Sequence, residues 1–172
     1  MPVSVKEPRA RAGEARIVDR AARRVAVVRT VGPPADAGKQ AIPILYRAVY
    51  GLKMARKRAG ADFTVGPLRA RWPNADAAPP AEWVGEWALA VPEDVPHLDG
   101  TEIETWEYGL TAEVLHVGPF ATESVGVDRL LAFVVEHGYE VAGPHEEEYL
   151  TRPEAKTQRT VVRYPVRRRL AS

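Results

Sequence analysis

The sequence has 172 residues, of which 45% are hydrophobic and 27% charged, and its formal net charge at pH 7 is +1. This composition is typical of a soluble globular chain that forms one domain or two small modules with a shared core, and it excludes a largely disordered protein. A charge so close to zero gives no electrostatic reason to expect direct binding to nucleic acid or to an anionic membrane. The sequence has no cysteine, which excludes disulfides, thiol catalysis and thiolate metal sites.

Membrane insertion, metals and cofactors are not expected either. No apolar run approaches the roughly 20 residues that a membrane span needs, and the N-terminus has no signal-peptide core, so we expect a cytoplasmic protein. The four histidines have no metal-ligand spacing such as His-x-x-x-His. The sequence does not fix the oligomeric state.

The first half predicts a strand, a helix and two further strands. An apolar stripe from Leu45 to Leu52 has helical spacing, Gly60 ends the helix, and Pro43 would kink any helical piece that begins at Asp36. Turn residues interrupt the alternating segments. The expected strands cover residues 16–31, 62–72 and 82–91, and residues 93–107 are expected to form a connection.

The second half repeats this order. A stripe from Val127 to Val135 predicts a helix that ends at His137-Gly138. The expected strands cover residues 110–117, 143–150 and 159–166.

The turn signals repeat together with the elements. Gly32-Pro33 and Gly118-Pro119 each follow a strand and precede a helix, and Gly66-Pro67 and Gly143-Pro144 each open the strand after the helix. We therefore predict an α+β fold made of two β-α-β-β modules related by a pseudo-twofold axis. It would have an antiparallel sheet, helices on one side and a ligand cleft between the repeats, in a groove on the side opposite the helices.

The expected domain organisation follows from these repeats. Residues 1–13 form a flexible lead-in, residues 14–168 form a single domain, and residues 169–172 form a tail. Within the domain the repeats cover about residues 14–92 and 108–168.

The strand over residues 143–150 carries three consecutive glutamates. Alternation sends His145, Glu147 and Tyr149 to one face and Glu146 and Glu148 to the other. In the first half the positions equivalent to His145, Glu147 and Tyr149 are apolar or small: Leu68, Ala70 and Trp72. We therefore predict that Glu147 lies on a sheltered face and that Glu146 and Glu148 are solvated.

A sheltered glutamate among aromatic rings has two uses. It can be the counter-charge for a cationic aromatic ligand, with ring faces adding cation–π attraction of about 0.5–2 kcal/mol each. It can also be a general acid or base. The alternative is that the glutamates only keep an edge strand soluble. Besides Glu147 and Tyr149, the candidate ligand-binding residues are Trp72, Trp83, Trp87, Trp106, Tyr108, Phe120 and His145.

The chain resembles the GyrI-like small-molecule-binding domain family, most strongly from Ala112 to Val166. The residues that carry the resemblance are His116-Val117-Gly118-Pro119-Phe120, His137-Gly138-Tyr139, Glu147-x-Tyr149-Leu150 and Arg163-Tyr164-Pro165. The resemblance implies a duplicated β-α-β-β fold and a pocket glutamate at Glu147 that contacts cationic, lipophilic ligands. Tyr50-Gly51-Leu52-Lys53 and Val65-Gly66-Pro67-Leu68 are similar to a branch of the family in which some proteins hydrolyse the cyclopropane ring of DNA-alkylating natural products.

Three hypotheses follow. The chain binds hydrophobic or cationic aromatic small molecules with Glu147 as the polar anchor. Alternatively it is a hydrolase of cyclopropanoid compounds, in which Glu147 handles water and Tyr149 donates a hydrogen bond. A third hypothesis is an interaction protein of the gyrase-inhibitor type that uses an exposed acidic surface at Glu146 and Glu148.

Overall fold

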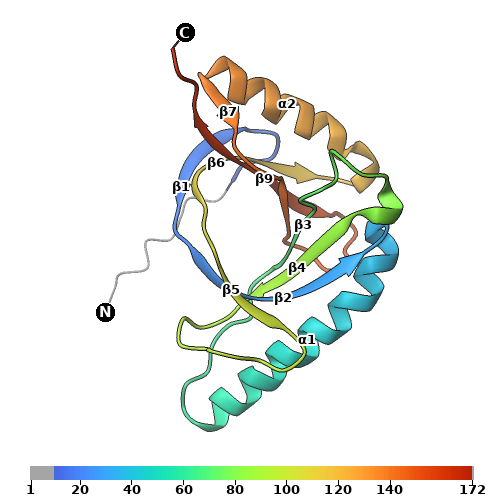
Figure 1. Ribbon diagram of the computed structural model, residues 1–172, viewed down its shortest axis with the longest axis vertical. Helices are drawn as coiled ribbons and strands as arrows, with labels where there is room; N and C mark the ends of the chain where they lie inside the picture. The colour runs from blue at the N-terminus through green and yellow to red at the C-terminus, as the bar shows by residue number, and fades with distance from the viewer. Residues whose placement is uncertain (1–9, 172) are drawn as a thin grey trace.

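One antiparallel sheet of nine strands organises the computed structural model, which describes residues 10–171, and the sheet curls strongly on itself (Figure 1). Its order is β1-β6-β9-β8-β3-β4-β2-β5, and β7 pairs with the end of β9. The strands are β1 (Arg16–Arg20), β2 (Arg23–Val31), β3 (Leu68–Arg71), β4 (Val84–Ala90), β5 (Glu102–Trp106), β6 (Gly109–Val117), β7 (Tyr139–Val141), β8 (Glu146–Tyr149) and β9 (Arg159–Arg168).

Two helices cover the outer, convex side of the curled sheet (Figure 1). Helix α1 (Pro34–Arg58) packs on β2 and β4, and helix α2 (Glu123–Glu136) packs on β6 and β7. Short 3-10 turns, η1 (Pro80–Glu82) and η2 (Phe120–Thr122), precede β4 and α2. The two central strands, β3 and β8, pair with each other between the halves that the helices cover. The predicted α+β class with helices on one side of an antiparallel sheet is confirmed.

The helical stripes expected from the sequence form the core under each helix. Leu45 and Val49 of α1 are fully buried, as is Leu130 of α2, and Val134 is 1% exposed. Pro43 lies inside α1, which begins nine residues earlier at Pro34, and its ring points to an exposed side. Burying these aliphatic side chains contributes about 1.5–3 kcal/mol each to folding.

The strand pattern of the first half differs from the prediction in three places. Residues 16–31 form two strands, β1 and β2, instead of one. The two strands lie toward opposite ends of the sheet: β1 pairs with β6, whereas β2 pairs with β4 and β5. Residues 93–107 contain the edge strand β5, whose Glu102 and Glu104 both bind Arg29 of β2. Only Leu68–Arg71 of the expected strand 62–72 is extended into the sheet.

The two halves of the sheet have matching strand orders. Counting outward from the central pair, the order is β3-β4-β2 in one half and β8-β9-β6 in the other. Along the chain, α1 follows β2 and precedes β3, and α2 likewise follows β6 and precedes β8. This agrees with two modules of the same plan, while an origin by duplication stays a prediction. Most of the expected lead-in lies outside the described residues, and Ala12 forms a parallel bridge with Leu115.

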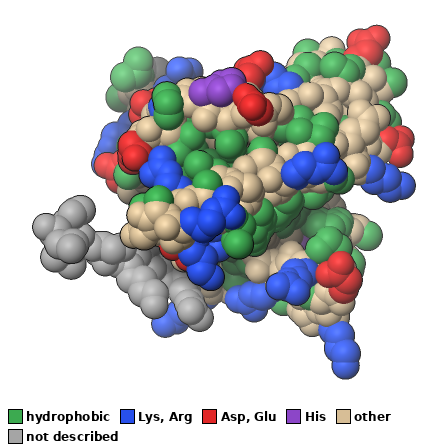
Figure 2. Space-filling model, turned by 90° about the horizontal axis from the view of Figure 1, so that it is seen from below, with side chains coloured by type: hydrophobic (Ala, Val, Ile, Leu, Met, Phe, Trp, Pro, Cys, Tyr) green, Lys and Arg blue, Asp and Glu red, His purple; other side chains and the backbone are tan. Residues whose placement is uncertain are grey.

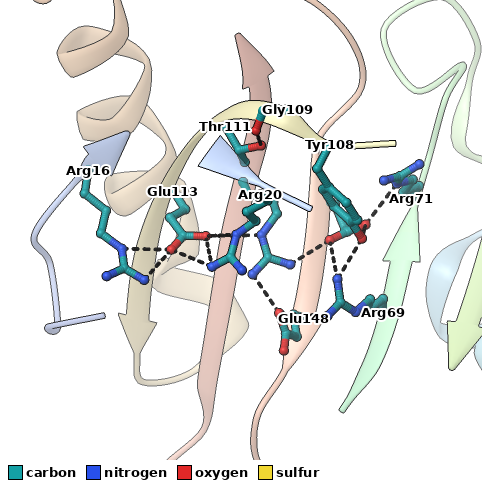
Figure 3. A network of polar contacts seen from close by, with 11 residues as sticks. Arg16, Arg20, Arg69, Arg71, Tyr108, Gly109, Thr111, Glu113 and Glu148 are labelled. Atoms are coloured by element: carbon teal, nitrogen blue, oxygen red, sulfur yellow. Dashed lines mark hydrogen bonds and ion pairs between the residues drawn. The ribbon is translucent and has the colours of Figure 1, made fainter. Parts of the chain in front are cut away.

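Charged side chains fill part of the inner, concave face of the sheet (Figure 3). Arg163 of β9 is 2% exposed and donates hydrogen bonds to three carboxylates: Glu113 (3.3 Å), Glu146 (2.7 Å) and Glu148 (2.6 Å). Burial by itself would raise the pKa of Glu113 and Glu148, but Arg163 and the other nearby arginines together outweigh it and hold both pKa values below the ordinary range.

The inner-face network reaches both sides of β8. Arg16 and Arg20 of β1 bind Glu113 through Nε at 2.8 and 2.9 Å, and Arg71 of β3 donates to Glu146 at 3.0 Å. The prediction that Glu146 and Glu148 are solvated is therefore wrong: they are 2% and 9% exposed and are paired with arginines. Their burial also removes the acidic docking surface on which the gyrase-inhibitor hypothesis depended.

The outer surface of the molecule carries charges of both signs. Seen from below the view of Figure 1, hydrophobic side chains run across the middle of the molecule, with basic and acidic side chains interspersed around them (Figure 2). The exposed large hydrophobic residues of α1 are Ile44, Tyr50 and Met54.

Replacing Arg163 by methionine should lower the free energy of unfolding by about 3–5 kcal/mol, because three buried carboxylates lose their shared partner. Arg167→Met is the matched control on the same strand. Its guanidinium is 68% exposed and pairs with Glu140, so its loss should change the free energy by less than about 1 kcal/mol. Urea unfolding of both variants measures the difference. Equal losses would show that the inner network does not hold the sheet together.

Candidate functional site: a carboxylate pair among aromatic rings

Glu147 lies on the outer face of the sheet, in the central strand β8. Its neighbours across the sheet are Ala70 of β3 and Val162 of β9, which are both buried. The side chain of Glu147 is 15% exposed, and the hydroxyl of Tyr149 donates a hydrogen bond of 2.6 Å to its Oε2. Burial and the charge of Glu147 raise the pKa of Tyr149 well above its ordinary value, so this hydroxyl keeps its proton.

The face of β3 and β8 that carries Glu147 is buried, as predicted, but it lies on the same side of the sheet as the helices and not on the opposite side. Leu68, Ala70 and Trp72 are at most 8% exposed. We expected the groove between the halves on the side opposite the helices. Glu147 shares its face with the core that α1 covers, since Tyr149 packs against that core, and with Val162, which belongs to the core under α2.

A second carboxyl group, Glu123, joins Glu147 from the first turn of α2. Burial raises the pKa of Glu123 to about 8, helped by the negative charge of Glu147 and a hydrogen bond with it. At neutral pH Glu123 therefore holds a proton beside the carboxylate of Glu147. Glu123 was not among the site residues expected from the sequence, because a glutamate in the first turn of a helix is ordinarily a solvated partner of the helix dipole. Only the packing of α2 against the sheet brings it to β8.

Aromatic rings surround the carboxylate pair. The ring of His145 lies between Trp72 and Tyr164, with centroid distances of 5.7 and 5.6 Å, and its Nε2 is 3.9 Å from Oε1 of Glu147. The ring of Phe120, which is half exposed, meets that of Tyr149 edge to face at 6.0 Å. Tyr164 was part of the family motif but not of the expected site.

The other predicted aromatic residues lie elsewhere. Trp87 is 4% exposed, packs edge to face on Trp72 and donates its indole N–H to Thr30, so it supports the site from the core. Trp83 packs at the margin of the same core and donates to the carbonyl of Ala78.

Two of the predicted aromatic residues lie on the inner face. Arg71 stacks on Trp106 at 3.7 Å, and Tyr108 joins the arginine–glutamate network (Figure 3). The structure thus brings together Glu147, Tyr149, Trp72, Phe120 and His145, and it places Trp106 and Tyr108 on the opposite face of the sheet.

The electrostatic field at the site is negative. Burial and then the charges of Asp76, Glu147, Glu123 and Asp128 raise the pKa of Tyr164. Two buried polar atoms of the site, Nε1 of Trp72 and Oε1 of Glu123, have no hydrogen-bond partner among residues 10–171. A hydrogen-bond donor, an acceptor and the side chain of Glu147 therefore lie together beside aromatic rings.

A family model of the GyrI-like small molecule binding domain matches residues 13–167. The chain belongs to this family. Solved structures share the GyrI-like fold. A conserved protein from Listeria innocua has a TM-score of 0.81 at 23% identity, covering 91% of this chain and 93% of its own. A protein described as a hydrolase from Listeria innocua has a TM-score of 0.78 at 22% identity, covering 92% and 94%. The EcmrR C-terminal domain has a TM-score of 0.67 at 16% identity, covering 90% and 98%.

No curated protein matches the sequence. As a member of the GyrI-like family the chain is a small-molecule-binding domain. Neither helix of the described part is long and apolar enough to cross a membrane. Within residues 10–171, no group of three or more His, Asp and Glu side chains is arranged to hold a metal ion.

The carboxylate pair predicts a specific titration. In the Glu147→Gln variant the pKa of Glu123 should fall only part of the way from about 8 toward 4.5, because the negative neighbour is gone while burial, the larger cause of the rise, remains. Carbon-13 NMR of the side-chain carboxyl groups measures it. A folded-state pKa above the unfolded value makes the wild type lose stability as pH rises from about 4.5 to 8, and this loss should be smaller in the variant.

The matched control is Glu136→Gln, which removes one charge from the exposed far end of α2 and should leave the titration of Glu123 unchanged. A wild-type Glu123 that titrates near 4.5 would contradict the pairing.

Proposed function

We propose that the chain binds cationic, lipophilic aromatic molecules at Glu147, between the rings of Trp72, Tyr149 and Tyr164. The proposal rests on one observation: the three consecutive glutamates of β8 have different partners. Glu146 and Glu148 are neutralised by arginines, whereas the polar partners of Glu147 among the described residues are a tyrosine hydroxyl, a distant histidine and a carboxyl group.

A cation at this position would gain from three sources. The carboxylate of Glu147 provides the counter-charge in a partly desolvated setting, where Coulomb attraction exceeds its value in water. Ring faces add cation–π attraction. Glu123 can release its proton when a cation arrives, so a second negative charge becomes available. A neutral ligand of the same shape would gain binding free energy only from the burial of its apolar surface.

Fluorescence titration with a cationic dye such as rhodamine 6G tests the proposal. The Glu147→Gln variant should bind the dye about 10–100-fold more weakly, which corresponds to about 1.4–2.8 kcal/mol for a lost charge-assisted contact. Glu136→Gln, with the same change of charge at an exposed position, should bind like the wild type. Equal affinities of Glu147→Gln and wild type would contradict the proposal.

A second candidate function is hydrolysis of a cyclopropanoid substrate at the same site, favoured by the raised pKa of Glu123, which suits a general acid, beside a second carboxyl group, Glu147. The ionised Glu147 would take a proton from water as the oxygen attacks the cyclopropane carbon. The strained carbon–carbon bond would break toward a conjugated carbonyl, whose oxygen would receive the proton of Glu123. The Tyr149 hydroxyl would hold Glu147 in place through its hydrogen bond.

Incubation with a spirocyclopropyl dienone and mass spectrometry distinguish the two functions. Hydrolysis predicts a product heavier by one water, and a rate at least about 100-fold lower in Glu147→Gln with substrate binding kept. Glu136→Gln should turn over at the wild-type rate. Binding without any hydrated product would reject hydrolysis and leave the binding function in place.

A further inference from the structure

The inner face of the sheet contains a small cavity that is separate from the Glu147 site. It has a volume of about 30 Å³ and lies where the chain turns from β1 into β2. By the same measure one water molecule needs about 10–15 Å³, so the cavity has room for a ligand of one or two heavy atoms. The residues that line it are Arg20, Ala21, Arg23, Arg69 and Tyr108.

The lining of this cavity is strongly basic. It includes three guanidinium groups and no carboxylate. The hydroxyl of Tyr108 accepts a hydrogen bond from Arg69 at 2.7 Å and donates its own proton to Glu146 at 2.8 Å, so it adds no negative charge. Next to the cavity, three arginines (Arg69, Arg71 and Arg163) share the carboxylates of Glu146 and Glu148.

Arg69 is the least satisfied member of the network. It is 6% exposed, and its nearest carboxylate oxygens, on Glu146 and Glu148, are 3.6 and 3.9 Å away, beyond hydrogen-bond distance. Its Nε is buried without a partner among residues 10–171. A buried guanidinium in this state is stabilised by an anion that accepts the remaining N–H groups.

We propose that this cavity binds one monatomic anion of the chloride class, held by Arg69 with Arg20 and Arg23 around it. The small volume favours a monatomic anion over sulfate and phosphate, and the basic lining favours an anion over water. A bound anion would join the β1–β2 turn to β3, which are distant in the sheet order, and would therefore stabilise the folded chain.

Thermal unfolding in sodium chloride, compared with sodium gluconate at the same ionic strength, tests the proposal. Chloride should raise the melting temperature in a saturable way, by about 3–6 °C at ten times its dissociation constant. Arg23→Met should weaken chloride binding about fivefold, because one exposed guanidinium of the lining is lost. Arg167→Met, an equal charge change on another strand, should keep the wild-type chloride response. Identical melting curves in the two salts would overturn the proposal.

Crystals of the wild-type protein soaked in bromide provide a test that does not depend on how a variant folds. Anomalous scattering should show a bromide ion in contact with Arg69. A water molecule at that position, with no anomalous signal, would overturn the proposal. Arg69→Met should remove both the bromide signal and the chloride-dependent stabilisation, and a variant that keeps either would contradict the assignment to Arg69.

Discussion

Arg163 joins three strands of the sheet by binding Glu113 of β6 and two glutamates of the neighbouring strand β8. Side chains alternate between the faces of a strand, so a contact that draws Glu146 and Glu148 inward turns Glu147 outward. A slip of β8 by one residue would expose the two paired glutamates to the apolar outer face and bring Glu147 to the arginines. The buried ion network therefore fixes the register on which the candidate site depends.

This constraint gives the two faces of β8 opposite electrostatic character. On the inner face, Arg163 of β9 binds all three glutamates, and further arginines pair with Glu113 from β1 and with Glu146 from β3. On the outer face the neighbours of Glu147 are aromatic rings and Glu123. Three identical residues in sequence thus have different surroundings: Glu146 and Glu148 pair with arginines of neighbouring strands, and Glu147 lies at the site where we propose that a ligand binds.

The outer site and the inner cavity are complementary in sign. A negative site between the helices suits a cation, and the basic cavity on the concave side suits an anion. The sheet lies between the two sites, so a ligand at one site would not contact a ligand at the other. Glu123 makes the outer site responsive to charge, because it can release its proton when a cation binds beside Glu147.

Local patterns in the sequence determined the two helices, most strands and the class of the fold. Comparison of the two halves also singled out Glu147, because Leu68, Ala70 and Trp72 mark a sheltered face. Periodicity identifies which residues share a face, but it cannot show what covers that face. Only the tertiary structure decided that Glu146 and Glu148 are buried among arginines and that Glu123 reaches Glu147. Those contacts join residues far apart in the chain, and they form only when the sheet curls and α2 packs against it.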